Sequence, residues 1–170
     1  MERPATIKLR THEMEKRGYT LIEILVALTI VGLIFAIGYV NFRDFSRRQS
    51  LAGQARSMKG DLRLAQGEAL AGNKPSDVFC NPPNRLNGFN FRVTGSSTYR
   101  VEANCTGGNV ITKNVTLPAD MSISTPSPNP ITFKILGQGT NVTADAVITI
   151  TQVGTSFTNT VTVTSGGEIK

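Results

Sequence analysis

The hydrophobic pattern of the chain begins with a long apolar run. Residues 19–40 read YTLIEILVALTIVGLIFAIGYV, and Glu23 is the one charged residue among these 22. A helix of this length spans about 33 Å at about 1.5 Å per residue, and the hydrocarbon core of a bilayer is about 30 Å thick. A buried helix of a soluble protein would need a comparable apolar partner, which the rest of the sequence lacks. The pattern therefore predicts a transmembrane helix over residues 19–40.

From residue 41 the apolar run gives way to an amphipathic helical pattern. Apolar and small side chains recur at steps of three and four residues, which places them on one face of a helix. These positions are Leu51, Ala52, Ala55, Met58, Leu62, Ala65 and Ala69, with Lys59 and Gln66 beside them. Gly72, Asn73 and Pro75 end the pattern. Residues 41–74 are predicted to form a stalk that continues the first helix to about Gly72 and packs its apolar stripe on a head domain.

After Pro75 the period changes to two, as expected of strands with one buried face. The alternating segments are residues 89–93, 99–105, 131–135, 148–150 and 161–163. Gly95–Ser97 separates the first two and predicts a hairpin turn, whereas TPSPNP at residues 125–130 predicts a loop. The head, residues 75–170, is therefore predicted to be an antiparallel β-sheet of six or seven strands with one face on the long N-terminal α-helix. This is an α+β organisation.

Composition narrows the classes of protein that fit this organisation. The chain has 170 residues, a formal charge of +6, one His, two Cys and no Trp. His12 lies in the N-terminal segment, so a nucleophile paired with His in the head is excluded. No Gly-rich phosphate loop precedes a helix, and the head carboxylates are scattered. The sequence predicts a protein that is not an enzyme, with no catalytic residue, metal or cofactor.

The residues before the apolar run predict the orientation of the chain. Met1–Gly18 holds five basic and three acidic side chains. Positive charge stays on the cytoplasmic side of a membrane, which predicts a cytoplasmic N-terminus and an exported head. A secretory signal peptide is the alternative, with Ala36 and Gly38 before the cleavage site and Tyr39 as the new terminus. The carboxylate of Glu23 either snorkels to the interface or has a function, since an unpaired intramembrane acid costs about 2.5 kcal/mol or more.

Residues 16–23, Lys-Arg-Gly-Tyr-Thr-Leu-Ile-Glu, resemble the processing site of type IV prepilins. The resemblance implies that residues 1–18 are a leader peptide, that a prepilin peptidase cleaves after Gly18, and that Tyr19 becomes the methylated N-terminus. The family usually has Phe where this chain has Tyr19. Glu23 matches the acid of the family motif. In a filament its carboxylate is expected to pair with the terminal ammonium of a neighbouring subunit, because an unpaired ion in an apolar bundle is costly.

The two cysteines, Cys80 and Cys105, both follow the apolar run. In an oxidising exterior they are expected to form a disulfide, and closing a loop of about 25 residues contributes roughly 3 kcal/mol in the chain-entropy model. Two buried thiols are the alternative. The strand pattern places Cys105 on the inward face of its strand.

Weaker matches, including residues 42–45 and 64–69, resemble the GspH/FimT group of minor pilins and pseudopilins. The resemblance implies a minor pilin of a type IV pilus or of its tip or initiation complex. The alternatives are a pseudopilin of a type II secretion system, a DNA-binding minor pilin in DNA uptake and, in a different class, an uncleaved membrane-anchored adhesin. The implied partners are other pilin or pseudopilin subunits, the inner-membrane assembly platform, the prepilin peptidase and N-methyltransferase, and the lipid bilayer. The implied location is the cytoplasmic membrane, crossed once, and then a filament on the cell surface.

Basic residues bear on the DNA hypothesis. The stalk carries a basic band that suits either anionic lipid head groups or a nucleic-acid track. The band consists of Arg43, Arg47, Arg48, Arg56, Lys59 and Arg63. In the head, DNA contact would fall to Arg85, Arg92, Arg100 and Lys170. DNA-binding members of the group have a Gly-Arg-x-Arg tail, whereas this chain ends Gly-Glu-Ile-Lys at residues 167–170, which weakens the hypothesis.

Overall fold

The computed structural model describes residues 18–170, except for the side chains of residues 37–41. Apart from Gly18, the predicted leader lies outside these residues. The chain divides into two compact units, Met1–Phe42 and Arg43–Lys170. We call the first the N-terminal unit and the second the head unit, and each is described by itself.

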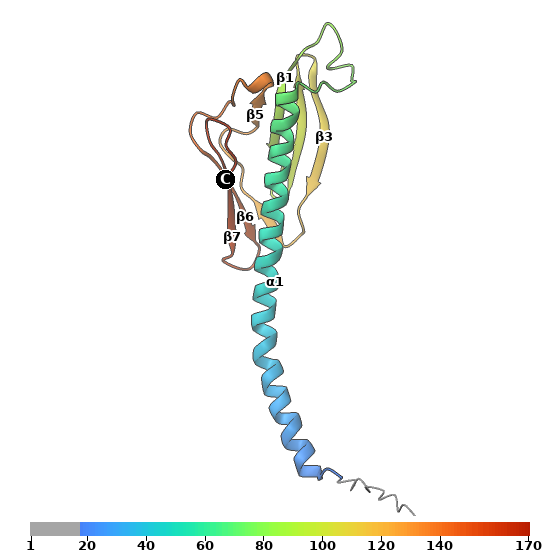
Figure 1. The fold of residues 1–170 in the computed structure, drawn as a ribbon, viewed down its shortest axis with the longest axis vertical. Coiled ribbons are helices and arrows are strands. Elements are labelled where there is room, and N and C mark those ends of the chain that lie inside the picture. Colours follow the sequence, from blue (N-terminus) through green and yellow to red (C-terminus); the bar gives the residue numbers. More distant parts are fainter. Residues whose placement is uncertain (1–17) are drawn as a thin grey trace, which may run out of the picture. The chain divides into compact units, whose positions relative to one another are not determined.

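Helix α1 runs from Leu21 to Ala71 (Figure 1). The predicted helix began two residues earlier and ended one residue later. The helix stops because Gly72 adopts the left-handed conformation, with a φ of 64°, that commonly ends helices. The amide of Asn73 then donates to the carbonyl of Glu68 at 3.0 Å, which satisfies one of the last helical acceptors.

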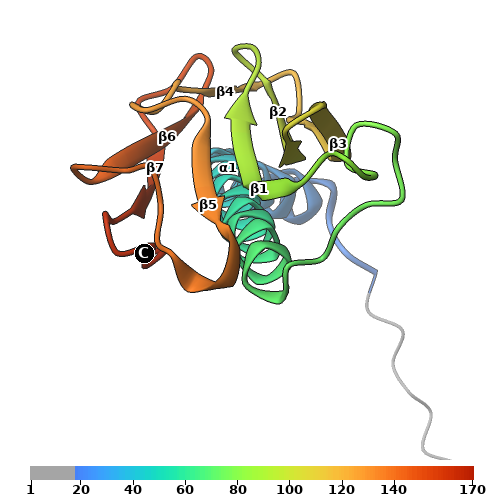
Figure 2. The ribbon, with the colours of Figure 1, turned by 90° about the horizontal axis from the view of Figure 1, so that it is seen from above.

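Seven strands follow α1 in the head unit. They are β1 (Leu86–Val93), β2 (Thr98–Cys105), β3 (Gly108–Thr116), β4 (Met121–Ile123), β5 (Ile131–Lys134), β6 (Ala146–Gln152) and β7 (Thr158–Val163). The strands form two antiparallel sheets, with orders β3-β2-β1-β5 and β4-β6-β7. The view in Figure 2 shows the strands arranged around one side of α1. The α+β fold class and the strand number are therefore confirmed.

The prediction of one sheet is wrong, because four strands form one sheet and three form a second. The segment 125–130 joins β4 of one sheet to β5 of the other. Its three prolines lack the N–H groups that a ladder needs, so the segment does not continue either sheet as a strand. The expected strand 131–135 also ends one residue early, since a 3₁₀ turn begins at Ile135.

The head unit has one hydrophobic core, built where the amphipathic stripe of α1 meets the inward faces of the strands. The α1 side chains in it are Leu51, Ala55, Met58, Leu62, Ala65 and Ala69, each at most 3% exposed. The predicted stripe is confirmed at these positions, while Ala52, Lys59 and Gln66 lie half-buried along its edge. The strands contribute Phe89, Phe91, Tyr99, Val101, Ile131, Phe133, Ile148, Ile150, Val161 and Val163.

Gly88 lets the central strand β1 approach β5. A Cβ added at Gly88 would overlap the carbonyl oxygen of Phe133, which is on the neighbouring strand. Phe89 and Phe133 face each other in the register of the two strands. The glycine thus permits a close backbone approach beside two large core side chains.

In the N-terminal unit, the part of α1 from Leu21 onward places its apolar side chains on the surface. Within the residues whose side chains are described, no helix combines the length and the apolar content of a membrane span. The predicted span, residues 19–40, includes residues 37–40, whose side chains are not among those described.

Candidate functional site

The start of α1 contains the residues that the sequence marks for processing and assembly. The hydroxyl oxygen of Thr20 accepts a hydrogen bond from the amide of Glu23 at 3.3 Å, and the Thr20 carbonyl accepts one from the amide of Ile24. Thr-x-x-Glu is the capping-box sequence, and a carboxylate in the first turn also stabilises the helix through its favourable interaction with the helix dipole. Thr20 therefore fixes where the helix begins and places Glu23 in its first turn.

The predicted scissile bond lies just outside this cap. Gly18 and Tyr19 precede the helix, both are exposed, and Tyr19 is 76% exposed. Among the described residues, and leaving out its chain neighbours, no atom lies within 4 Å of a Cβ added at Gly18. The backbone between Gly18 and Tyr19 is neither helical nor buried, which is the accessible form that a peptidase requires.

The helix that follows is apolar on every side. Its exposed large apolar residues are Leu21, Ile22, Ile24, Leu25, Val26, Leu28, Ile30, Val31, Leu33, Ile34 and Phe35, each at least 46% exposed. A helix that is apolar all round belongs in a core, a bundle or a membrane. Apolar surface of this extent marks an interaction site. This segment is built to be covered by something other than its own side chains.

In the head unit, an ion-pair cluster that the sequence pattern did not reveal ties α1 to the strands. Asp61 of α1 accepts a hydrogen bond from the hydroxyl of Tyr99 at 2.9 Å and pairs with the ammonium of Lys113 at 2.6 Å. Burial, together with the hydrogen bond to Asp61, raises the pKa of Tyr99 well above its ordinary value. One signal was available in the sequence, because Asp61 lies on the apolar stripe, three residues after Met58 and four before Ala65.

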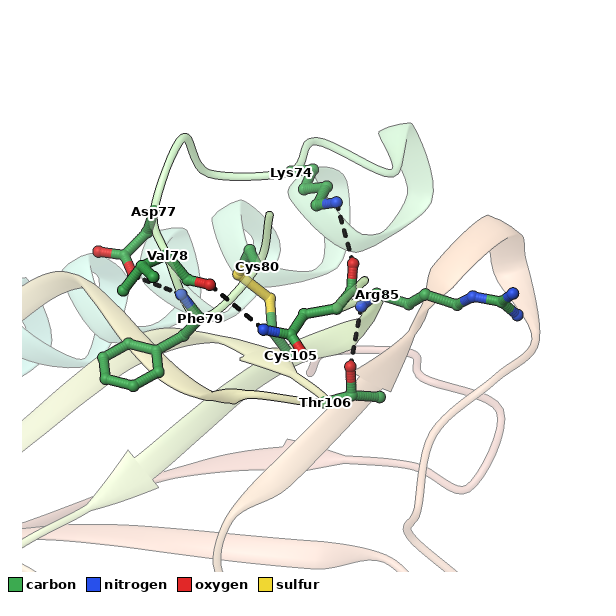
Figure 3. The surroundings of a disulfide bond; sticks show 9 residues. Lys74, Asp77, Val78, Phe79, Cys80, Arg85, Cys105 and Thr106 are labelled. Carbon is green, nitrogen blue, oxygen red and sulfur yellow. Dashed lines mark hydrogen bonds between the residues drawn. A yellow bond between two sulfur atoms is a disulfide. The ribbon is translucent and has the colours of Figure 1, made fainter. Parts of the chain in front are cut away.

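The structure joins Cys80 and Cys105 in a disulfide, with their Cα atoms 5.2 Å apart. The bond fixes the loop of residues 73–85 to the end of β2 (Figure 3). Side chains of the loop add hydrogen bonds, from Lys74 to the carbonyl of Asn84 at 3.1 Å and from Asn84 to the carbonyl of Val78 at 3.2 Å. The loop is therefore held in one shape although most of its side chains are exposed.

Of the four head residues proposed for DNA contact, the structure brings together Arg92 and Arg100, which are partners in the register of β1 and β2. Arg92 and Arg100 each direct Nε to the fully buried carboxylate of Glu102, both at 2.8 Å. Lys170 pairs with Glu168 at 3.1 Å. Arg85 lies just before the start of β1, whereas Arg92 lies near its end. In Figure 3 the side chain of Arg85 extends away from the disulfide.

Glu102 is a second buried charge that the sequence pattern did not reveal. The period of two that places Cys105 on the inward face of its strand puts Glu102 on the outward face of β2, yet Glu102 is 0% exposed. The amides of Asn90 and Asn109 donate to the same carboxylate, at 3.3 and 3.0 Å. Arg92 and Arg100 thus serve first to neutralise a buried acid. In residues 18–170, no three His, Cys, Asp or Glu side chains are grouped as a metal site.

Comparison with known proteins gives two family matches and one solved structure of the same fold. The prokaryotic N-terminal methylation motif matches residues 14–39, and the type II transport protein GspH model matches residues 54–167. The chain is also similar to the type IV minor pilin FimU of Pseudomonas aeruginosa, strain PAO1, at 12% identity. That match covers 74% of this chain and 90% of the other, with a TM-score of 0.54. No curated protein sequence matches the chain.

The match to FimU shows the fold, a long helix packed on antiparallel sheets. The resemblance to prepilin-like proteins is confirmed by the methylation motif, which includes Gly18, Tyr19 and Glu23. The family model covers more than half of the chain and describes structural pilin-like subunits rather than enzymes. The chain therefore belongs to the type II transport protein GspH family and is a type IV pilin-like structural subunit.

Proposed function

We propose that the chain is a minor subunit of a type IV pilus, at its tip or in its initiation complex. In this proposal a prepilin peptidase cleaves between Gly18 and Tyr19, the amine of Tyr19 is methylated, and the helix then assembles with other subunits. The observation that carries the proposal is the exposed Gly18–Tyr19 junction next to a capped helix that is apolar on every side.

Glu23 has the central role in this mechanism. Cleavage creates an ammonium at Tyr19, and methylation leaves its positive charge in place. Among apolar helices a carboxylate and an ammonium are each costly when alone, so the ammonium of one subunit is expected to pair with Glu23 of its neighbour. Because Thr20 holds Glu23 in the first turn, the pair sets the register in which a new subunit enters the bundle.

Before assembly, the apolar helix is proposed to rest in the cytoplasmic membrane, with a cytoplasmic N-terminus and an exported head. The disulfide between Cys80 and Cys105 supports an oxidising location for the head. The proposed partners are other pilin or pseudopilin subunits, the inner-membrane assembly platform, the prepilin peptidase and N-methyltransferase, and lipid. Extraction exchanges lipid for a helical bundle, so an apolar helix keeps apolar surroundings throughout.

A pseudopilin of a type II secretion system is the second candidate, and the match to the GspH family favours it. Deleting the gene separates the two. A minor pilin predicts fewer surface pili with normal release of exported proteins. A pseudopilin predicts normal pili with exported proteins retained in the cell envelope. If both remain normal, neither proposal stands.

DNA binding and uncleaved adhesion have less support than either kind of subunit. In the head, the DNA hypothesis rested on Arg85, Arg92, Arg100 and Lys170, and three of these four are engaged by acids of the same chain. The hypothesis of an uncleaved adhesin requires that the chain keep its first 18 residues. Determining the N-terminus of the chain in its native membrane tests that directly.

A further inference from the structure

A hollow of about 220 Å³ lies in the head unit between the last turns of α1, the turn after β5 and the C-terminal tail. Arg63 of α1 and Lys134 at the end of β5 both line it. Within the described part of the chain, none of the residues that line the hollow is acidic. We call this space the basic hollow.

The two cations of the basic hollow are unmatched. Among residues 18–170, neither Arg63 nor Lys134 has an ion pair or a side-chain hydrogen bond. The acids that adjoin the lining in sequence are engaged elsewhere, because Asn73 donates to the carboxylate of Glu68 and Lys170 pairs with Glu168 at 3.1 Å. Two like charges that share one hollow repel each other, and an anion between them would reverse the sign of this interaction.

The backbone around the hollow adds donors. Gly139 and Gly166 both line it, and the amide of neither donates to another group of the described residues. Around Gly139 the sign of φ alternates, from 73° at Gly137 to −71° at Gln138 and 81° at Gly139. Successive left- and right-handed residues form backbone concavities that bind anions. Leu136, with a φ of 53°, is also held in the left-handed region, and strain of this kind gathers at functional sites.

The walls of the basic hollow are fixed before any ligand arrives. The side-chain amide of Gln66 donates to the carbonyl of Gly167 at 3.0 Å, and the hydroxyl of Thr140 donates to the carbonyl of Ser165 at 3.1 Å. These two bonds tie the C-terminal tail to α1 and to the turn after β5. A site whose parts lose little freedom on binding keeps more of its interaction energy as affinity.

The lining favours a carboxylate over other anions. A guanidinium such as that of Arg63 matches the planar carboxylate with two parallel hydrogen bonds. Apolar lining comes from Phe133, 2% exposed, and from Leu70, 60% exposed. It can cover the CH₂ groups of an acidic side chain, which inorganic phosphate lacks. A nucleic-acid strand requires cations repeated along its phosphates, whereas this hollow has two.

We propose that the basic hollow binds the carboxylate of an aspartate or glutamate side chain from a different subunit of the filament. Arg63 and Lys134 pair with the carboxylate, and the free amides complete its hydrogen bonds. The inference rests on the proposed function, because a minor subunit at a tip or in an initiation complex has other kinds of subunit as its neighbours.

A carbodiimide tests the contact in sheared native filaments. This reagent joins an amine and a carboxylate that touch, forming an amide while it takes up the water that is lost. The expected product is a link between Lys134 and an Asp or Glu of a different filament subunit, identified by mass spectrometry. Lys134→Arg keeps the charge but has no amine to acylate, so it should lose the link and keep incorporation within about twofold. The proposal is overturned if Lys134 forms no link, or links only to an acid of this chain or of a second copy.

Charge removal measures what the contact contributes. Arg63→Gln with Lys134→Gln should lower incorporation into filaments about tenfold, because both pairing cations are lost. Arg56→Gln with Arg85→Gln removes the same net charge from exposed residues outside the hollow, and it should change incorporation less than about twofold. Equal losses in the two double variants would indicate a general effect of charge and would contradict the proposal.

Binding to the purified full chain in detergent identifies the anion. The probes are glutamate blocked at both ends, glutamine blocked in the same way, and inorganic phosphate. Blocked glutamate should cause saturable shifts of the Gly139 and Gly166 amide signals in nitrogen-15 spectra. Blocked glutamine, or the Arg63→Gln, Lys134→Gln variant with blocked glutamate, should bind at least about tenfold more weakly. Absence of saturable shifts, or tighter binding of phosphate than of blocked glutamate, contradicts a carboxylate site.

Failure of this inference differs from failure of the proposed function. If the chain begins at Tyr19 and enters filaments, but the Arg63→Gln, Lys134→Gln variant enters them equally well, the carboxylate contact fails while the proposed function stands. If the unmodified chain is absent from filaments, the proposed function itself fails.

Discussion

The two parts of α1 meet their surroundings in opposite ways. From Leu21 to Phe35 the large apolar side chains are at least 46% exposed. From Leu51 to Ala69 the apolar stripe is at most 3% exposed under the strands of the head unit. The head buries its apolar stripe within one chain, whereas the first part of the helix leaves its apolar side chains exposed. Changes in the two parts are therefore expected to affect different properties, namely folding for the head and assembly for the helix.

The largest expected effect is on assembly. Glu23→Ala removes the carboxylate that is proposed to pair with a neighbour's ammonium, so incorporation into filaments should fall at least about tenfold. Glu23 lies in the N-terminal unit and does not belong to the hydrophobic core of the head unit, so the folding of the head should not change. Immunoblots of sheared filaments measure the incorporation. Asp44→Ala, which removes another exposed acid of α1, is the matched control. Normal incorporation of the Glu23→Ala chain would contradict the proposed role of Glu23 in assembly.

The next effect is on stability and compares equivalent substitutions in the two parts. Leu62 is 0% exposed and Leu28 is 66% exposed. Leu62→Ala should lower the free energy of unfolding of the head by about 2–5 kcal/mol, because it removes transfer energy and leaves a cavity. Leu28→Ala should leave it unchanged. Urea unfolding of the full chain in detergent, monitored at the disulfide-containing head, distinguishes the two variants. Equal losses in the free energy of unfolding would contradict the comparison.

The disulfide should contribute an intermediate effect. Replacing both Cys80 and Cys105 by Ala removes a constraint between residues 25 apart in sequence. The chain-entropy model gives a loss of about 3 kcal/mol in the free energy of unfolding. Reducing agent applied to the unmodified chain should produce the same loss, and it should have no effect on the double variant. A reduced chain as stable as the oxidised one would show that the loop is held by its other contacts.

The smallest effect comes from the cluster that joins α1 to the strands. Since the pKa of Tyr99 is raised in the folded head, its contribution is fully present below pH 10 and is lost as the pH rises above that value. Tyr99→Phe should cost about 1 kcal/mol at pH 7 through the lost hydrogen bond to Asp61, and should remove this part of the alkaline decline. Urea unfolding between pH 7 and 11 provides the measurement. An unaltered alkaline decline in Tyr99→Phe would contradict the assignment.

Sequence patterns predicted what depends on near neighbours. The long helix to within two residues at each end, the stripe from Leu51 to Ala69 and the hairpin at Gly95–Ser97 all follow from periodicity and turn residues, and the structure contains them. The processing motif likewise lies within eight consecutive residues.

The division of strands between two sheets was not predictable in the same way, because strand pairing joins segments far apart in sequence. The buried acids were missed for this reason too. Asp61 is satisfied by Tyr99 and Lys113, 38 and 52 residues away. In the sequence Glu102 resembled an ordinary outward residue, because apolar and polar residues alternate regularly along its strand. Only the fold brings the two arginines to its carboxylate.

Assembly through Tyr19 and Glu23 is tested most directly by the intact mass and N-terminal sequence of the chain from its native membrane. Prepilin processing predicts a chain that begins at methylated Tyr19 and is about two mass units lighter than its reduced form, the two thiol hydrogens lost in the disulfide. A chain that begins at Met1 would be an uncleaved membrane-anchored protein. A chain that begins at Tyr39 would be a secreted one that has lost the apolar helix, and either result would contradict assembly through Tyr19 and Glu23.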